Sequence, residues 1–258
     1  MKKMLALLMA ITMLLGLTVP AFAETDMEYV KNKGVLVVGV TDFAPMDYKD
    51  DNGEWIGFDA DMAKAFAEYL GVKVELVEID WDNKILELNG KSIDCVWNGM
   101  TLTDEVKSAM ETSKAYANNA QVVVLPVAKA GDFADVAALS ALSFAVEAGS
   151  AGEAEIDALG YNKTPVQSQA SALLEVKAGT SDAAVIDALM AAAMVGEGTD
   201  YADLTYTFAL NSEEYGVGFR QGSDLAEALN AFMAAAYADG SMMAIAETYG
   251  VQAAIIAQ

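Results

Sequence analysis

The sequence predicts an α/β protein in which strands and helices alternate along two successive stretches of the chain. Residues 35–40 are a continuous β-branched run, as expected for a buried parallel strand. An amphipathic helix is expected over residues 58–70. Strands over 72–79 and 93–97 then flank a short helix over 83–88. This rhythm favours a mainly parallel sheet flanked by helices.

The same rhythm begins again after residue 120 and then returns to a final helical segment. Its expected elements are strands over 121–126, 143–146 and 181–187, a helix over 168–178, a returning strand over 215–220 and helix from 223 onward with a break at 239–240. Two α/β units joined by extended segments are therefore expected. Ligands of such folds bind at the carboxyl ends of strands or between lobes.

The first 23 residues have the composition of a secretory signal peptide. Lys2 and Lys3 precede an apolar run over residues 4–19, and residues 21–23 (AFA) supply the small-x-small pattern of a cleavage site. The run is short for a membrane span and leads directly into that site. We therefore expect a cleaved signal peptide over 1–23 and a periplasmic or extracellular protein.

The composition excludes some functions and disfavours others. The chain has 15 Lys+Arg against 38 Asp+Glu and a formal net charge of −23, so it repels nucleic acid and anionic lipid. It contains no histidine, the usual general base and the commonest zinc ligand. Its single cysteine, Cys95, lies in an apolar strand pattern and is expected to be buried. An enzyme, a metal site and a cofactor are therefore not expected.

A series of short motifs runs along almost all of the chain after the leader. The motifs are residues 34–40 (GVLVVGV), 43–48 (FAPMDY), 57–64 (GFDADMAK), 99–103 (GMTLT), 147–150 (EAGS), 177–183 (KAGTSDA), 215–222 (YGVGFRQG) and 238–241 (ADGS). Each motif alone is weak, whereas their order is specific. In that order they resemble the polar-amino-acid family of bacterial extracellular solute-binding proteins, family 3.

The resemblance implies the type II two-lobe periplasmic-binding-protein fold, with two hinge strands and a cleft that closes on a ligand. Lobe 1 is expected over residues 24–120 and 212–258, and lobe 2 over residues 121–211. The implied function is the substrate-binding component of an ABC importer. Such a protein, expected as a monomer, captures an amino acid or amino-acid-like solute and delivers it to a membrane permease.

The resemblance also implies ligand-binding positions. Asp187 matches the family's ammonium-binding acid, and Asp42 matches another pocket position. Phe43 and Trp81 match aromatics that contact the ligand's side chain, although packing between the lobes is an alternative role for Trp81. The other expected ligand-binding residues are Asn98, Gly99, Met100, Thr101, Thr103, Ser150 and Ala151.

The chain departs from the family where a ligand's α-carboxylate would bind. Val106 stands in place of the family's arginine, and Ala151 in place of its threonine. Arg220 is the only arginine of the chain and is expected to lie away from the pocket. A bidentate guanidinium contact to the carboxylate is therefore not expected.

Three alternatives follow from this departure. Backbone N–H groups near Thr101 and Thr103, and at the helix start after Ser150, are one set of donors for an anion. Lys107 is a second source of positive charge, although its position directs it elsewhere. The third alternative is a ligand without an α-carboxylate, such as an amine.

Two other functions use the same fold. A few relatives of this fold are dehydratases that act on cyclic amino-acid precursors, and Glu147 is a candidate for the acid that such catalysis needs. A sensor or chemoreceptor input module is the second alternative. Such modules are normally fused to a membrane span and a signalling domain.

Overall fold

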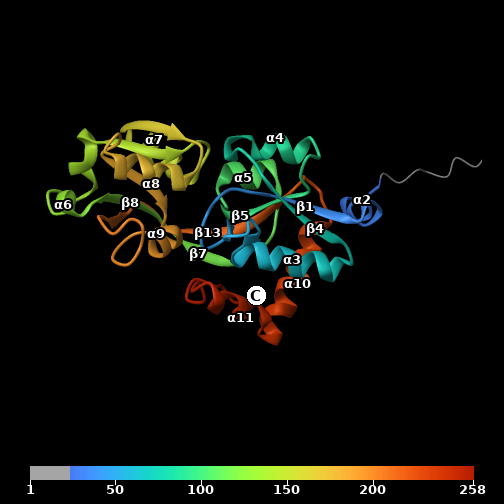
Figure 1. Ribbon diagram of the computed structural model, residues 1–258. Helices are drawn as coiled ribbons and strands as arrows, with labels where there is room; N and C mark the ends of the chain where they lie inside the picture. Colours follow the sequence, from blue (N-terminus) through green and yellow to red (C-terminus); the bar gives the residue numbers. More distant parts are fainter. Residues whose placement is uncertain (1–23) are drawn as a thin grey trace, which may run out of the picture.

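The computed structural model describes residues 24–258, which form two α/β lobes, each built on its own sheet (Figure 1). The predicted signal peptide, residues 1–23, lies outside the described residues. Within the described part of the chain, no helix is long and apolar enough to cross a membrane.

Lobe 1 contains a six-stranded sheet in the order β4-β1-β5-β13-β6, with β7 paired to β13. β1 pairs in parallel with β4 and β5, whereas the returning strand β13 runs antiparallel to β5. The strands are β1 (Val35–Val40), β4 (Lys73–Glu78), β5 (Cys95–Thr101), β6 (Glu111–Thr112), β7 (Ala117–Asn119) and β13 (Glu213–Phe219).

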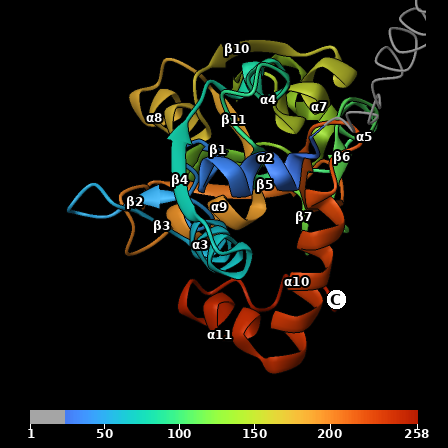
Figure 2. The same ribbon diagram turned by 90° about the vertical axis from the view of Figure 1, so that its right-hand side faces the viewer.

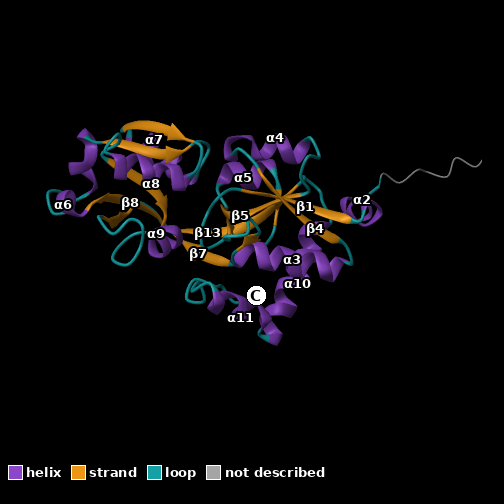
Figure 3. Ribbon diagram, viewed as in Figure 1, coloured by secondary structure: helices purple, strands orange, loops and turns teal. Residues whose placement is uncertain are grey.

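Helices flank this sheet, as the colouring in Figure 3 shows. α3 (Phe58–Leu70) buries Phe58, Met62 and Phe66 and packs on β4 and β5, and Gly71 ends it in the left-handed region at φ 76°. The two C-terminal helices pack on each other and against α3 (Figure 2). The other helices of the lobe are α2 (Asp26–Lys33), η1 (Trp81–Asn83), α4 (Lys84–Asn89), α5 (Asp104–Ala109), α10 (Leu225–Asp239) and α11 (Ser241–Thr248).

Lobe 2 contains a five-stranded sheet in the order β10-β9-β11-β8-β12. β9 pairs in parallel with β10 and β11, and β8 pairs antiparallel with β11 and β12. The strands are β8 (Gln121–Pro126), β9 (Ser143–Glu147), β10 (Asn162–Val166), β11 (Ala183–Asp187) and β12 (Leu204–Ala209). The helices are α6 (Val127–Ala130), η2 (Val136–Ala141), α7 (Ala151–Leu159), α8 (Gln169–Ala178) and α9 (Ala188–Met194).

The chain crosses between the lobes twice, from β7 into β8 and from β12 into β13 (Figure 1). The two crossings are hydrogen-bonded to each other. The N–H of Leu210 donates to the carbonyl of Gln121 at 2.8 Å, and the N–H of Gln121 donates to the Asn211 side chain at 2.7 Å. This paired connection is the geometry of a hinge.

Several strands depart from the sequence predictions. β5 continues from residue 97 to Thr101, because its polar residue Asn98 is buried and bonded inside the lobe. The edge strands β10 and β12 and the hairpin of β2 (Tyr48–Lys49) with β3 (Trp55–Ile56) were not expected. β10 and β12 occupy sheet edges, where strands carry polar and exposed residues and give little hydrophobic signal. Cys95 is fully buried, as predicted.

Candidate functional site

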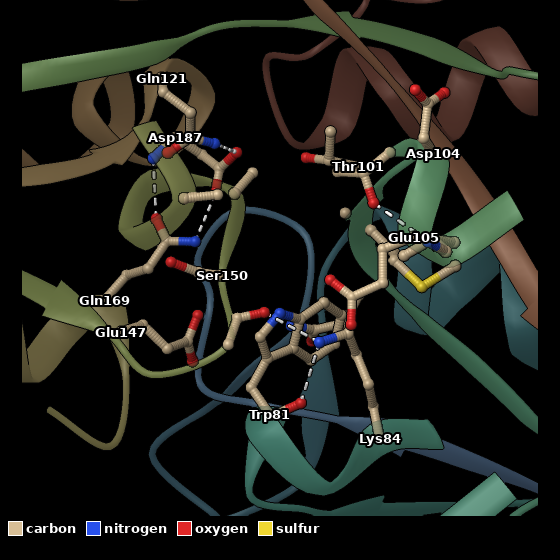
Figure 4. Close-up of a pocket in the computed structure, with 18 residues that line it drawn as sticks. Trp81, Lys84, Thr101, Asp104, Glu105, Gln121, Glu147, Ser150, Gln169 and Asp187 are labelled. Carbon is tan, nitrogen blue, oxygen red and sulfur yellow. Dashed lines mark hydrogen bonds between the residues drawn. The ribbon is translucent and has the colours of Figure 1, made fainter. Parts of the chain in front are cut away.

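A cavity of about 290 Å³ lies between the two lobes, at the carboxyl ends of β5, β9 and β11 (Figure 4). All of the ligand-binding residues expected from the sequence line it, except Asp42 and Phe43. Lobe 1 contributes Trp81, Lys84, residues 98–101 and residues 103–106, and lobe 2 contributes Gln121, Glu147, residues 149–151, Ala154, Gln169 and Asp187. Their contact with a ligand stays a prediction.

Gly99 forms part of the lobe 1 wall, and its backbone conformation depends on glycine. Its φ is 54°, and a Cβ there would lie 2.3 Å from the ring of Phe43. Its N–H donates to the buried Asp59 carboxylate at 2.6 Å. Phe43 therefore lies behind the wall, where it is 1% exposed and edge-on to Tyr215. It was expected in the pocket but does not line the cavity.

Asp42 is exposed and also lies outside the cavity. It follows β1 between Thr41 and Phe43, which are both buried. Asp42 therefore does not line the cavity in this structure, and its contact with a ligand stays a prediction.

A helix from each lobe begins at the cavity, capped by a side chain that the sequence singled out. The Ser150 hydroxyl accepts from the N–H of Glu153 at 3.1 Å at the start of α7. The Thr103 hydroxyl accepts from the N–H of Val106 at 3.1 Å at the start of α5. These hydroxyls stabilise the helix starts. The remaining N–H groups of α7's first turn can donate to an anionic group of a ligand.

Asp187 is held by side chains from four different segments. Its Oδ1 accepts hydrogen bonds from Asn119, from Gln121 at 2.8 Å and from the Tyr215 hydroxyl at 2.9 Å. Its Oδ2 accepts from Gln169. A carboxylate has about two acceptor positions on each oxygen, so protein donors fill those of Oδ1, whereas Oδ2 keeps one position free.

Burial is the main electrostatic influence on Asp187. Desolvation, followed by the nearby charge of Glu213, raises the pKa of Asp187 well above its usual range, whereas the hydrogen bonds from Gln169 and Tyr215 lower it. Glu213 bonds the same amides, Asn119 and Gln121, at 2.7 and 2.8 Å. Asp187 in the cavity wall and Glu213 at the hinge therefore share neutral amide donors.

Glu147 ends β9 and faces the cavity beside Ser150 and Gln169 (Figure 4). It is 3% exposed, and its Oε1 has no hydrogen-bond partner among residues 24–258. Burial first, and the Asp187 charge second, raise the pKa of Glu147 to about 8. At neutral pH this acid is therefore mostly protonated in the empty protein.

Lys84 is the one basic side chain among the described residues that line the cavity. Its Nζ donates across the cleft to the carbonyl of Gly149 at 2.9 Å. Within its own lobe it donates to the carbonyl of Trp81 at 3.2 Å. It also lies 4.9 Å from the centre of the Trp81 ring. Burial lowers the pKa of Lys84. Lys84 and Trp81 therefore hold one end of the closed cleft.

The carboxylate-binding arginine of the family has no counterpart among the described lining residues. Val106 and Ala151 line the cavity at the corresponding positions. Arg220 lies elsewhere and bonds Asp26 at 3.0 Å and Asp94 at 3.4 Å. Lys107 is exposed and does not line this cavity.

Sequence reasoning missed Lys84, Gln121 and Gln169, and it considered Glu147 for catalysis alone. One available signal was the spacing of Trp81 and Lys84, three residues apart at the start of a helix and so on one face. The two glutamines carry no motif, since their place depends on how the lobes pack.

Comparison with known proteins identifies the family. Residues 36–252 match the model of bacterial extracellular solute-binding proteins, family 3. The chain belongs to this family. The resemblance predicted from the sequence is confirmed.

Relatives of this solute-binding protein bind several amino acids. It is 28% identical to the L-cystine-binding protein TcyJ of Escherichia coli K12, over 93% of this chain and 92% of that one. It is 30% identical to the L-arginine-binding protein of Pseudomonas aeruginosa, over 96% of each chain. It also matches a cyclohexadienyl dehydratase of P. aeruginosa, 32% identical over 32% of this chain and 31% of that one.

Solved structures agree with the two-lobe fold of this solute-binding protein. A mutant of ArgBP from T. maritima is 32% identical and superposes with a TM-score of 0.81, covering 87% of this chain and 98% of that one. The predicted type II periplasmic-binding-protein fold is confirmed.

Proposed function

We propose that this solute-binding protein captures a positively charged amino acid, or a related amine, in the cleft between its lobes. It delivers this solute to the membrane permease of an ABC importer. It does so as a monomer outside the inner membrane, after removal of the leader over residues 1–23.

The charge of the cavity carries this proposal. Its described lining contains the acids Asp104, Glu105, Glu147 and Asp187. The single basic side chain, Lys84, already donates to two carbonyls. A buried acid is stable only when it is protonated or paired with a cation. A positively charged solute supplies the missing charge.

The family relatives support the same class of ligand. Two proteins with arginine-binding names are about 30% identical over most of their length. An ancestral arginine-binding protein bound to arginine superposes with a TM-score of 0.78 at 32% identity. Arginine, the amino acid in these names, carries a positive charge on its side chain.

Calorimetric titration with a series of charges tests the binding step. The probes are arginine, lysine, agmatine (arginine without its carboxylate), glutamine and glutamate. We expect at least one cationic probe to bind with a dissociation constant below about 10 μM, which corresponds to roughly 7 kcal/mol, and glutamate to bind at least a hundredfold more weakly. A preference for glutamate, or no binding by any cationic probe, contradicts the proposal.

Uptake by whole cells tests the delivery step. Deletion of the gene is expected to remove most high-affinity uptake of the radiolabelled probe that binds most tightly, and a plasmid copy is expected to restore it. Unchanged uptake in the deletion strain contradicts a role in import.

A dehydratase is the alternative that one observation favours. Glu147 is a buried acid in the cavity that keeps its proton at neutral pH, as a general acid must. The other lining charges oppose this function, since prephenate-like substrates carry two carboxylates and the cavity is acidic. Incubation with prephenate, followed by product analysis, separates the two functions: turnover supports catalysis, and its absence supports binding alone.

A further inference from the structure

The end of β9 carries an acid with an unused acceptor. Glu147 Oε1 has no hydrogen-bond partner within the described chain, although the residue is 3% exposed and lines the cavity. An unpaired acceptor in such a place costs free energy in the empty protein. A hydrogen-bond donor that reaches this oxygen removes that cost.

Asp187, the acid that the family resemblance singles out, differs in this respect. Its two oxygens accept four hydrogen bonds, from Asn119, Gln121, Tyr215 and Gln169. Three of these bonds end on Oδ1 and one on Oδ2, so a ligand donor finds one acceptor position on Asp187, at Oδ2. Glu147 differs because its Oε1 accepts no hydrogen bond from residues 24–258 and lacks any partner in the empty protein.

The groups around Glu147 do not pair with its carboxyl group. Asp187 on β11 is a second acid that raises the pKa of Glu147 further, and Lys84 on the opposite lobe is the nearby cation. Lys84 donates to the carbonyls of Gly149 and Trp81 and makes no hydrogen bond to Glu147.

Among the described residues, the cations of the other elements packed against β9 are bonded elsewhere. On α7, Glu153 accepts from the N–H of Gly149 and pairs at 2.7 Å with Lys163, the basic residue of β10. On α8, Gln169 is neutral and bonds Asp187, and Lys177 donates to the carbonyl of Asp200 at 2.7 Å. Across the cleft, Asp82 lies against Gly149 and Glu105 lines the cavity, and both are acids.

We propose that Glu147 is a second ligand-binding acid that accepts a hydrogen bond from the cationic end of the solute and releases its own proton when that solute binds. This inference rests on the proposed function, because it names the acid that recognises the positive group. In the empty protein the proton neutralises Glu147. In the complex the ligand's positive charge replaces it, and the proton leaves to solvent.

Proton release makes affinity depend on pH in a definite direction. Below about pH 8 the empty protein holds a proton on Glu147, and a cationic ligand must displace it. Affinity for such a ligand therefore rises with pH up to about 8 and then levels off. For one linked proton the dissociation constant changes by at most about tenfold per pH unit.

Calorimetry with arginine and agmatine, in buffers of different ionisation enthalpy, measures the protons released. We expect release to approach one proton per ligand at pH 7 in the wild type and to fall by at least half in Glu147→Gln. The ratio of the dissociation constants of Glu147→Gln and wild type should grow at least tenfold between pH 5 and pH 8. Glu197→Gln, the same change at an exposed site of lobe 2, should leave both quantities at the wild-type value.

The outcomes separate this inference from the proposed function. Binding by the wild type with equal proton release in Glu147→Gln overturns the inference alone. A pH-independent ratio of dissociation constants does the same. Absence of binding by both probes overturns the inference and the proposed function together.

A measurement on the empty protein is independent of affinity. Carbon-13 NMR of the glutamate carboxyl groups should show one resonance that titrates near pH 8 and disappears in Glu147→Gln. Addition of arginine or agmatine should move that titration to lower pH. If the resonance that disappears in Glu147→Gln titrates in the ordinary range near pH 4, the inference is overturned.

Discussion

Two acids that end neighbouring strands, Glu147 and Asp187, line the cavity with different hydrogen bonding. The sequence directed attention to Asp187 through the family pattern, and the structure places it in the wall of the cavity. The sequence could not indicate that neutral side chains from the hinge and α8 donate to Asp187. Those contacts join residues up to 68 positions apart and depend on packing.

Replacing Asp187 tests its contribution to the stability of the folded protein. Asp187→Ala removes the acceptor of four buried or part-buried donors, each of which costs about 1–3 kcal/mol when unsatisfied. Removal of a desolvated acid offsets part of this cost. We therefore expect the free energy of unfolding to fall by about 2–4 kcal/mol in urea titrations. Glu197→Ala is the exposed control, and equal stability of the two variants contradicts the network.

A substitution at Val106 tests whether a ligand's carboxylate binds at this position of the cavity. It is 4% exposed and lines the cavity where the family has arginine. Val106→Arg places a guanidinium beside Thr103 and Ser150, so we expect arginine to bind at least tenfold more tightly relative to agmatine. The ratio of the two dissociation constants is the measurement. An unchanged ratio shows that a ligand carboxylate lies elsewhere.

At the scale of elements, the loop between β9 and α7 is where the lobes touch. Gly149 has φ 69°, and a Cβ there would lie 2.8 Å from the Cα of Asp82 on the opposite lobe. A second contact, from Gln167 to Asp80 at 3.1 Å, lies nearby. The sequence marked this loop through its EAGS motif, but the motif alone does not show that the loop meets the other lobe.

Gly149→Ala is therefore expected to hold the lobes apart. The added methyl group collides with backbone, which cannot rotate away, so we expect at least tenfold weaker ligand binding and a larger radius of gyration with ligand by small-angle scattering. Gly160→Ala is the matched control, since it has φ 70° at the other end of α7 with nothing within 4 Å of its Cβ. Equal binding by both variants contradicts cleft closure at this loop.

Elements with strong hydrophobic patterns were predictable, whereas edge strands and hinge contacts were not. β1, α3 and β8 lie at the predicted residues. β10 and β12 were missed because their side chains are partly exposed and include Pro165 and several threonines. Phe43 and Asp42 were expected in the pocket and do not line the cavity in this structure, since a family position does not reveal that Phe43 packs behind Gly99 and that Asp42 is exposed.

At the scale of the whole molecule, several acids are buried in a chain that is already strongly acidic. Burial raises the pKa of Asp59 to about 7, and burial with the charge of Asp59 raises that of Asp47. Both oxygens of Asp47 are without hydrogen-bond partners in residues 24–258. Glu147 and Asp187 add the same tendency in the cleft.

Stability of the empty protein should therefore fall as pH rises from about 5 to 8. These acids keep protons in the folded state that the unfolded chain releases near pH 4, so each lowers the unfolding free energy by up to about 1.4 kcal/mol per pH unit in its window. Urea titrations at several pH values measure the slope. Asp59→Asn should reduce it between pH 5 and 7, which separates this effect from the overall negative charge. Stability that is flat or rises with pH contradicts the burial of protonated acids.

The two-lobe architecture was predictable because different family motifs follow one another in the expected order along the chain. Each motif is weak alone, but together they identify the fold. The proposal of a positively charged ligand depends on the acids from β9, β11 and α5, which only the structure places around one cavity. A crystal structure with the tightest-binding probe of the charge series tests that claim most directly. We expect the probe to lie between the lobes, with its cationic group within hydrogen-bond distance of Glu147. A probe bound outside the cleft, or one that directs its carboxylate toward Glu147, would contradict it.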